Sequence, residues 1–385
     1  QERLKYSEKI DGDKLSRFFG KTASAFLTNS EGENRIYSPV NVYVALSMLA
    51  EISGGESRKQ ILELTEADSI EKLRTQVSSL WKLLYRNDGA GDTVLANSLW
   101  INKGIEINPD AANRVAEEYF ASVYRGDTAS EETLTAMKKW LNDQTGGLLE
   151  YSVNNFTLSP DTVMSLCSTV LFHGKWHSSN EFDKENTEIG IFHGFNGDTE
   201  AEFMNQTYSG DYFWGENYGA TKLDFETDGQ MWFILPDEGK SVDDVLNSGE
   251  FSEMFKYDKW EDNTWDKRKD ADINIRLPKF DVSSDMELAE GLKALGVTDV
   301  FDSEKADFSL LLKDSEGVYL NKAEHAARVV IDEEGCTAAA FTAMVGAMGG
   351  PPDYEDVDFV LDRPFIFAIT DIKGEILFMG CVYTV

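Results

Sequence analysis

Residues 333–351 read EEGCTAAAFTAMVGAMGGP, and this stretch decides how the rest of the chain is interpreted. The residues before it, RVVIDEE at 328–334, are typical of a β-strand that runs into a turn at Gly335. After its first two residues the stretch carries no charge, and it ends in a Gly-Gly-Pro-Pro cluster at 349–352 that helices and central strands rarely accommodate. Since the small residues at 337–340 fit a helix or a strand, we expect a mobile element with two possible positions. The alternative is a short alanine-rich helix packed on the body of the protein.

The composition describes an acidic protein that is large enough for a sizeable core. The 385 residues are 42% hydrophobic and 12% aromatic, and no segment has the composition of a linker, so a single domain over residues 1–385 is expected. With 69 acidic and 36 basic residues the net charge is −33. This charge argues against nucleic acid, heparin-like polyanions and acidic membranes as partners. No run of about 18 apolar residues is present, so we expect no membrane-spanning helix.

The cysteines leave the cellular compartment open. Cys167, Cys336 and Cys381 are odd in number and widely spaced, so they define no disulfide framework. Gln1 is compatible with the start of a processed mature chain. We expect an extracellular, secreted protein, with a cytoplasmic location as the alternative.

The order of the predicted elements indicates an α+β fold. The first third is mainly helical, the rest is mainly strands, and there is no βαβ alternation. Ser38 before a proline predicts the start of a buried helix. The predicted helices are 15–27, 40–52, 57–64, 70–85, 109–124, 134–145 and 286–295. The predicted strands are 34–37, 93–101, 162–172, 213–225, 230–235, 273–280, 359–370 and 375–383.

The common catalytic and cofactor motifs are missing from the sequence. The four histidines, His173, His177, His193 and His325, occur without an HExxH motif or a thiolate partner, so no metal site is predicted. There is no nucleophile elbow, Walker loop or dinucleotide fingerprint. We therefore expect no cofactor and no enzymatic activity; a hydrolase with a scattered site is a minor alternative.

Ten segments, in order, resemble the serpin family of protease inhibitors over nearly the whole chain. The matching segments include NRIYSPVNVYVALSML (34–49), WLNDQTGG (140–147), FHGKW (172–176), MWFILPDEG (231–239), LPKF (277–280), HAA (325–327), RPFIF (363–367) and LFMG (377–380). The resemblance implies a serpin fold, with helices in the N-terminal part packed on large, mostly antiparallel sheets. It also implies a mobile reactive-centre loop at about residues 335–356.

The resemblance further implies a suicide-substrate inhibitor, whose reactive-centre loop a protease attacks as it would a substrate. After cleavage the loop inserts into the central sheet as a new strand, while the protease stays attached as an acyl-enzyme. The expected partner is a serine protease in a covalent complex with a monomeric inhibitor. A non-inhibitory serpin, acting as a carrier or a chaperone-like binding protein, is the alternative. The hinge that would enter the sheet first comprises Glu333, Glu334, Gly335, Cys336, Thr337, Ala338, Ala339, Ala340, Phe341 and Thr342.

A second group resembles the residues that control opening of the central sheet in this family. The group comprises Ser38, Asn41, Ser168, Trp176 and His325. Asn41 occupies a position where the family often has serine, and Ser168 one where it often has asparagine. The alternative for His325 is a buried histidine with satisfied hydrogen bonds and no further role.

The side chains of the loop are compatible with insertion. Alternate positions place Cys336, Ala338, Ala340, Thr342 and Met344 on one face of a strand, and this face suits a buried slot. The opposite face, which includes Phe341, also has no charge and no proline.

The position of the cleaved bond sets the protease class. Counting the family's usual sixteen residues from Glu333 gives Gly349–Gly350, and a shift of one or two residues places Met348 beside the bond. Because this window has no arginine or lysine, elastase-, subtilisin- or chymotrypsin-like serine proteases are the expected targets. A papain-like cysteine protease is the alternative.

Overall fold

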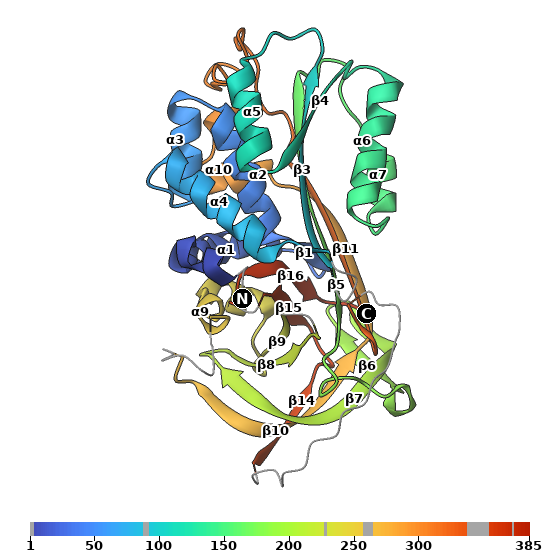
Figure 1. The fold of residues 1–385 in the computed structure, drawn as a ribbon. Helices are drawn as coiled ribbons and strands as arrows, with labels where there is room; N and C mark the ends of the chain where they lie inside the picture. The colour runs from blue at the N-terminus through green and yellow to red at the C-terminus, as the bar shows by residue number, and fades with distance from the viewer. Residues whose placement is uncertain (1–3, 88–91, 227–228, 257–264, 337–353, 372) are drawn as a thin grey trace.

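Two β-sheets lie one above the other, with most of the helices around the upper sheet (Figure 1). The structure is a computed structural model that describes residues 4–87, 92–226, 229–256, 265–336, 354–371 and 373–385. The core joins residues of both sheets and of the helices between them, from Leu15 near the N-terminus to Tyr383 near the C-terminus.

The helices are concentrated in the first 155 residues, as the sequence predicts. They are α1 (Gly12–Leu27), α2 (Pro39–Ile52), α3 (Gly55–Leu64), α4 (Ile70–Leu84), α5 (Pro109–Glu118), α6 (Glu131–Gln144) and α7 (Glu150–Asn155). The later ones are short: α8 (Val242–Ser248), α9 (Phe251–Met254) and α10 (Ala289–Ala294), with 3₁₀ turns η1 (Leu4–Lys9), η2 (Lys184–Asn186) and η3 (Asp299–Phe301). None of the helices in the described residues has the length and apolar character needed to cross a bilayer.

The upper sheet has helices on both faces. In strand order it contains β11 (Phe280–Glu287), β12 (Glu324–Asp332), β13 (Gly335–Cys336), β5 (Met164–Lys175), β3 (Asp92–Asn102) and β2 (Arg86–Asn87), and β4 (Ala121–Gly126) also pairs with β3. Figure 1 shows α2 to α5 on one side of this sheet and α6 and α7 on the other. Because both faces are covered, the sheet lies between two layers of helices.

The lower sheet is built mainly from the second half of the chain. Its order is β1 (Arg35–Tyr37), β16 (Ile376–Val382), β15 (Phe365–Thr370), β9 (Gln230–Pro236), β8 (Tyr218–Asp224), β7 (Gly197–Trp214), β10 (Arg268–Pro278) and β14 (Glu355–Val360), and β6 (Glu188–Gly194) pairs with β7. Only the β3–β4 and β10–β14 pairs are parallel among the described strands. The expectation of an α+β fold with mostly antiparallel sheets is thus confirmed.

Four predicted elements are wrong in extent. The predicted helix 109–124 ends at Glu118, because Phe120 takes a φ of +53° that no helix continues, and the chain then forms β4 from Ala121. The predicted strand 359–370 is divided into β14 and β15 at Pro364, which lacks the N–H that a continuous ladder needs. The predicted strand 213–225 is interrupted between β7 and β8. The predicted helix 286–295 begins only at Ala289, because the residues up to Glu287 continue β11.

Helix α2 is held at both ends, and it places its first turn against the upper sheet. At the N-terminus the Ser38 hydroxyl accepts a hydrogen bond from the Asn41 N–H, as a capping residue does. Near the C-terminus the buried Glu51 carboxylate accepts hydrogen bonds from Arg74 of α4, at 2.6 and 2.9 Å, and from Arg114 of α5, at 2.8 Å. These contacts fix α2 relative to its neighbouring helices.

Candidate functional site: the hinge and the open strand edges

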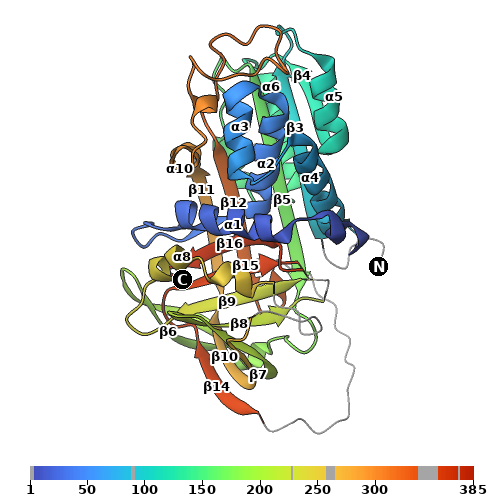
Figure 2. The ribbon, with the colours of Figure 1, turned by 90° about the vertical axis from the view of Figure 1, so that its left-hand side faces the viewer.

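The ladder of the upper sheet is interrupted between β5 and β12. The two-residue strand β13 pairs with both neighbours: Cys336 lies opposite Ile331 of β12 and opposite Gly174 of β5. Beyond Cys336, in the direction of Met164 on β5 and Glu324 on β12, no ladder within the described part of the chain joins β5 to β12. Each strand pairs only on its far side there, β5 with β3 and β12 with β11 (Figure 2). We call the two facing margins, 164–173 of β5 and 324–330 of β12, the open edges.

The turn that leads into β13 requires glycine at position 335. The Asp332 carboxylate accepts hydrogen bonds from the backbone N–H groups of Glu334, at 2.8 Å, and of Gly335, at 3.2 Å. Gly335 has a φ angle of +135°, and a Cβ atom there would lie 2.3 Å from the carbonyl oxygen of Gly174. Both the backbone conformation and the close approach to β5 therefore exclude a side chain.

The two glutamates of the hinge are tied to neighbouring elements. Buried Glu333 accepts hydrogen bonds from Thr187, at 2.8 Å, and contacts the Lys279 ammonium at 2.9 Å. Glu334 forms an exposed ion pair with Lys184, at 2.8 Å. Burial alone raises the pKa of Glu333, but the hydrogen bonds from Lys279 and Thr187 outweigh it and hold the pKa below its usual value. These contacts fix the start of the hinge.

Trp176 lies at the hinge, at the same end of β5. Its indole N–H donates to the carbonyl of Asp332 at 3.0 Å, and its ring stacks on Phe225 with 5.0 Å between the ring centroids. Ser168 is eight residues away on β5, or roughly 26 Å along an extended strand. The structure therefore places Trp176 apart from the other four residues of the predicted sheet-opening group.

The other four residues of that group meet where the first turn of α2 contacts the open edges. The backbone N–H of Ser38 donates to Nε2 of His325 on β12, at 3.0 Å. The Asn41 side chain donates to the backbone carbonyl of Ser168 on β5, at 2.9 Å. One helical turn thus contacts both strands that β13 separates.

His325 is neutral in this arrangement, because Nε2 must be unprotonated to accept a hydrogen bond. Burial lowers the pKa of His325 to about 4, so the ring carries no charge at neutral pH. The ring also packs edge-on against Tyr37. The hydrogen bond from Ser38 agrees with the interpretation of His325 as a buried histidine with satisfied hydrogen bonds. The position of His325 on the open edge of β12 is the observation that favours a role in sheet opening.

The remaining predicted site residues lie outside the described residues. They are Thr337, Ala338, Ala339, Ala340, Phe341, Thr342, Met348, Gly349 and Gly350.

Several residues of the hinge site could not be found from the sequence. Thr187 and Lys279 are 146 and 54 positions from Glu333, so only the folded chain brings them together. Asp332 had a local signal, because aspartate before a glycine turn commonly accepts backbone N–H groups.

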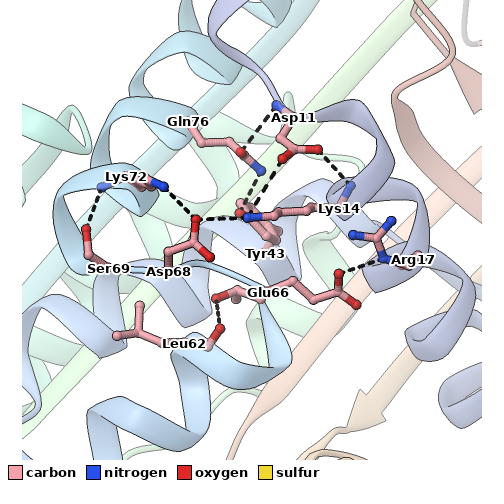
Figure 3. A network of polar contacts seen from close by, with 11 residues as sticks. Asp11, Lys14, Arg17, Tyr43, Leu62, Glu66, Asp68, Ser69, Lys72 and Gln76 are labelled. Carbon is pink, nitrogen blue, oxygen red and sulfur yellow. Dashed lines mark hydrogen bonds and ion pairs between the residues drawn. The ribbon is translucent and has the colours of Figure 1, made fainter.

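A separate surface pocket of about 320 Å³ lies between η1, α1 and the start of α4 (Figure 3). Its charged groups neutralise one another: Lys14 and Lys72 both contact Asp68, at 3.2 and 2.6 Å, and Arg17 contacts Glu66 at 2.7 Å. The Tyr43 hydroxyl accepts a hydrogen bond from Gln76. This network holds the N-terminal segment on the helices. Elsewhere, the described residues form no cluster of three or more metal-ligating side chains.

Comparison with known proteins identifies the family. The family model described as serpin (serine protease inhibitor) matches residues 14–385, so the chain belongs to the serpin family. Serpin-ZX of Arabidopsis thaliana is 28% identical over 374 residues, which cover 92% of this chain and 93% of that protein. Serpin B11 of Mus musculus is 27% identical over 381 residues, covering 92% and 94%.

Solved structures agree with this assignment. The thermophilic serpin tengpin in its native state superimposes with a TM-score of 0.82 at 27% identity, covering 97% of this chain and 93% of tengpin. Thyroxine-binding globulin in complex with thyroxine gives 0.77 at 22% identity, covering 97% and 98%, and at that identity it shows the fold alone. The resemblance and the serpin fold inferred from the sequence are both confirmed.

Proposed function

We propose that this serpin is a suicide-substrate inhibitor of serine proteases, with residues 337–346 inserting between β5 and β12 after cleavage. The observation that carries the proposal is that β13 already occupies one end of the interrupted ladder, the end nearest the lower sheet. Gly335 and Cys336 are paired on both sides, and beyond them β5 and β12 have open edges among the described residues. A loop that continues from Cys336 would enter those edges directly.

The register of β13 assigns a neighbour to each inserted residue. Because both pairings are antiparallel, each step along the loop is one step back along β5 and along β12. Thr342, six residues after Cys336, would then lie between Ser168 and His325. The insertion would place a threonine hydroxyl at the point where α2 contacts both strands.

The same register decides which side chains become buried. Residues directly opposite one another in a ladder point to the same face. Cys336 lies opposite Ile331, which shares its buried face with Val329, Ala327 and His325. Even-numbered loop residues would therefore face the core, and these are the small residues Ala338 and Ala340 before Thr342.

Insertion supplies enough free energy to distort a captured enzyme. About ten inserted residues would form ladder hydrogen bonds with two strands, each contributing roughly 1 kcal/mol net. The sum, on the order of 10 kcal/mol or more, is comparable with the stability of a protease domain, about 5–15 kcal/mol. Hence an attached protease can lose part of its folded structure.

The chemistry uses the ordinary acylation step of the target. The protease serine oxygen attacks the carbonyl carbon of Gly349, or of Met348 in the alternative register. The peptide C–N bond breaks, the amine leaves with a proton from the catalytic histidine, and an ester joins the two proteins. If the loop inserts before water hydrolyses this ester, the distorted protease cannot complete hydrolysis and the ester bond persists.

The first test incubates the protein with pancreatic elastase, subtilisin, chymotrypsin and trypsin, and with papain for the cysteine-protease alternative. We expect a complex at the summed mass that survives denaturing electrophoresis with at least one elastase-, subtilisin- or chymotrypsin-like enzyme. Mass analysis of the released C-terminal peptide identifies the cleaved bond. Cleavage without any such complex would reject inhibition and support a carrier or chaperone-like serpin, whereas a complex with papain alone would change the target class.

A matched pair of variants tests insertion itself. Ala338→Asp would bury a carboxylate between Phe172 and Val329 and should convert the inhibitor into a substrate. Ala339→Asp is the control, because the register places it on the opposite face beside Arg328, and it should retain inhibition. Equal stoichiometry of inhibition in both variants would contradict the assigned register.

A further inference from the structure

β6 is an edge strand with apolar side chains on its exposed face. In the described residues it forms a ladder only with β7. Ile189 is 67% exposed and Ile191 43%, whereas Phe192 is fully buried. Edge strands normally carry charges or prolines at such positions, because these prevent pairing with other chains. In Figure 2, β6 lies at the margin of the lower sheet.

On the side of β6 that faces away from β7, two backbone N–H groups have no backbone partner among the described residues. The N–H groups of His193 and Phe195 point away from β7, since they donate to the carbonyl oxygens of Asp362 and Tyr383. Alternate residues of a strand direct their N–H groups to the same side, so those of Ile189 and Ile191 also point away from β7. Neither has a backbone acceptor in the part of the chain that the structure describes.

A row of carboxylates runs beside the two isoleucines. Ile189 lies opposite Glu202 of β7, and Ile191 lies opposite Glu200. Glu202 contacts Lys279 at 3.4 Å, whereas exposed Glu200 has no ion pair with any described residue. The exposed face of the β6–β7 pair therefore carries two rows of side chains. The apolar row lies on β6, next to its unpaired backbone edge, and the acidic row lies on β7.

We propose that β6 docks an extended, cationic segment of a partner protein, which adds to its free edge as a further strand. Lysine or arginine at alternate positions of that segment would lay aliphatic stems over Ile189 and Ile191. Their cationic ends would reach Glu200 and Glu202. The partner's backbone would complete the hydrogen bonds of the two isoleucines.

A second copy of this chain fits the surface less well. It would bring another acidic row to the same edge, on a protein whose net charge is already −33. The proposal is also independent of protease inhibition, because β6 belongs to the lower sheet and the open edges belong to the upper one.

The test measures binding of a fluorescent peptide that alternates lysine and valine, at low ionic strength, by anisotropy. We expect binding to the intact protein and none of the corresponding peptide that alternates glutamate and valine. The double variant Ile189→Thr/Ile191→Thr keeps the β propensity of the strand and should weaken binding about tenfold or more. Tyr151→Ser removes a large side chain that is even more exposed, on α7, and should leave binding unchanged.

A second pair of variants separates the acidic row from the overall charge. Glu200→Gln should weaken binding by roughly threefold, the range of an exposed ion pair. Glu290→Gln removes one charge from α10 and should have no effect. Equal effects of the two substitutions, unchanged binding to the Ile→Thr variant, or no binding at all would each overturn the proposal. So would self-association of the Glu200→Gln variant through β6 in sedimentation experiments, because it would identify a second copy as the occupant.

Discussion

At the scale of single residues, the contact between α2 and the open edges depends on His325, which few other residues could replace because its ring must accept a hydrogen bond while buried. His325 accepts the Ser38 N–H through Nε2, and the ring is buried away from water. The sequence could identify His325 and Ser38 by resemblance, but it could not show which ring nitrogen accepts. It also could not find Thr187 or Lys279, because their contacts with Glu333 exist only in the folded chain.

His325 should make the stability depend on pH between about 4 and 6.5. Its pKa is lower in the folded protein than in the unfolded chain, so the unfolded chain binds more protons in this window. The free energy of unfolding should therefore fall as the pH decreases from 6.5 towards 4, by on the order of 3 kcal/mol for a shift of two to three pH units. Urea unfolding at several pH values measures this loss.

The variant His325→Gln isolates the contribution of the imidazole. A glutamine oxygen can accept the Ser38 N–H but does not titrate in this range. The difference in unfolding free energy between the two proteins should change across the window, since carboxylates elsewhere titrate equally in both. A constant difference from pH 7 to pH 4 would show that His325 is not the group responsible.

At the scale of elements, the decisive feature is a strand of two residues. Strand β13 separates β5 from β12, and the sequence predicted only a turn at Gly335. Propensity alone could not show that Gly335 is paired on both sides, because one of its partners, Lys175 of β5, is far from it in the sequence. The division of 359–370 at Pro364 shows the opposite case, in which a local signal, a proline without a backbone N–H, is enough to end the strand.

Gly335→Ala should therefore destabilise the protein beyond the cost of its backbone conformation. The added Cβ would meet the Gly174 carbonyl, and β13 would have to leave its position or push β5 aside. We expect a loss of about 2–4 kcal/mol in the free energy of unfolding, the sum of backbone strain and overpacking. Gly317→Ala is the control: its φ is +73°, but no atom lies within 4 Å of the added Cβ, so about 1 kcal/mol is expected. If urea unfolding shows a similar loss of unfolding free energy in both variants, the contact between the added Cβ and β5 does not destabilise the protein.

At the scale of the whole molecule, the described residues leave the upper sheet incomplete between β5 and β12, while its two layers of helices remain in place. Composition and segment order were sufficient to predict the α+β class and the serpin fold, because many matches in order constrain one architecture. They could not predict how far β5 and β12 are joined, because both strands would have the same apolar pattern in a closed sheet. Only the register of β13 relates the loop to the open edges.

Cleavage in the loop should consequently raise the stability of the protein, although breaking a chain usually lowers it. Insertion of about ten residues at roughly 1 kcal/mol each adds on the order of 10 kcal/mol. With an unfolding entropy of about 2.1 cal/mol/K per residue, this corresponds to an increase in Tm of about 10 °C for a chain of this length. Calorimetry of the intact and the nicked protein measures the shift. The nicked Ala338→Asp variant should show no increase, because its loop cannot enter the sheet. If the nicked wild-type protein melts at or below the temperature of the intact protein, the loop does not insert between β5 and β12 after cleavage.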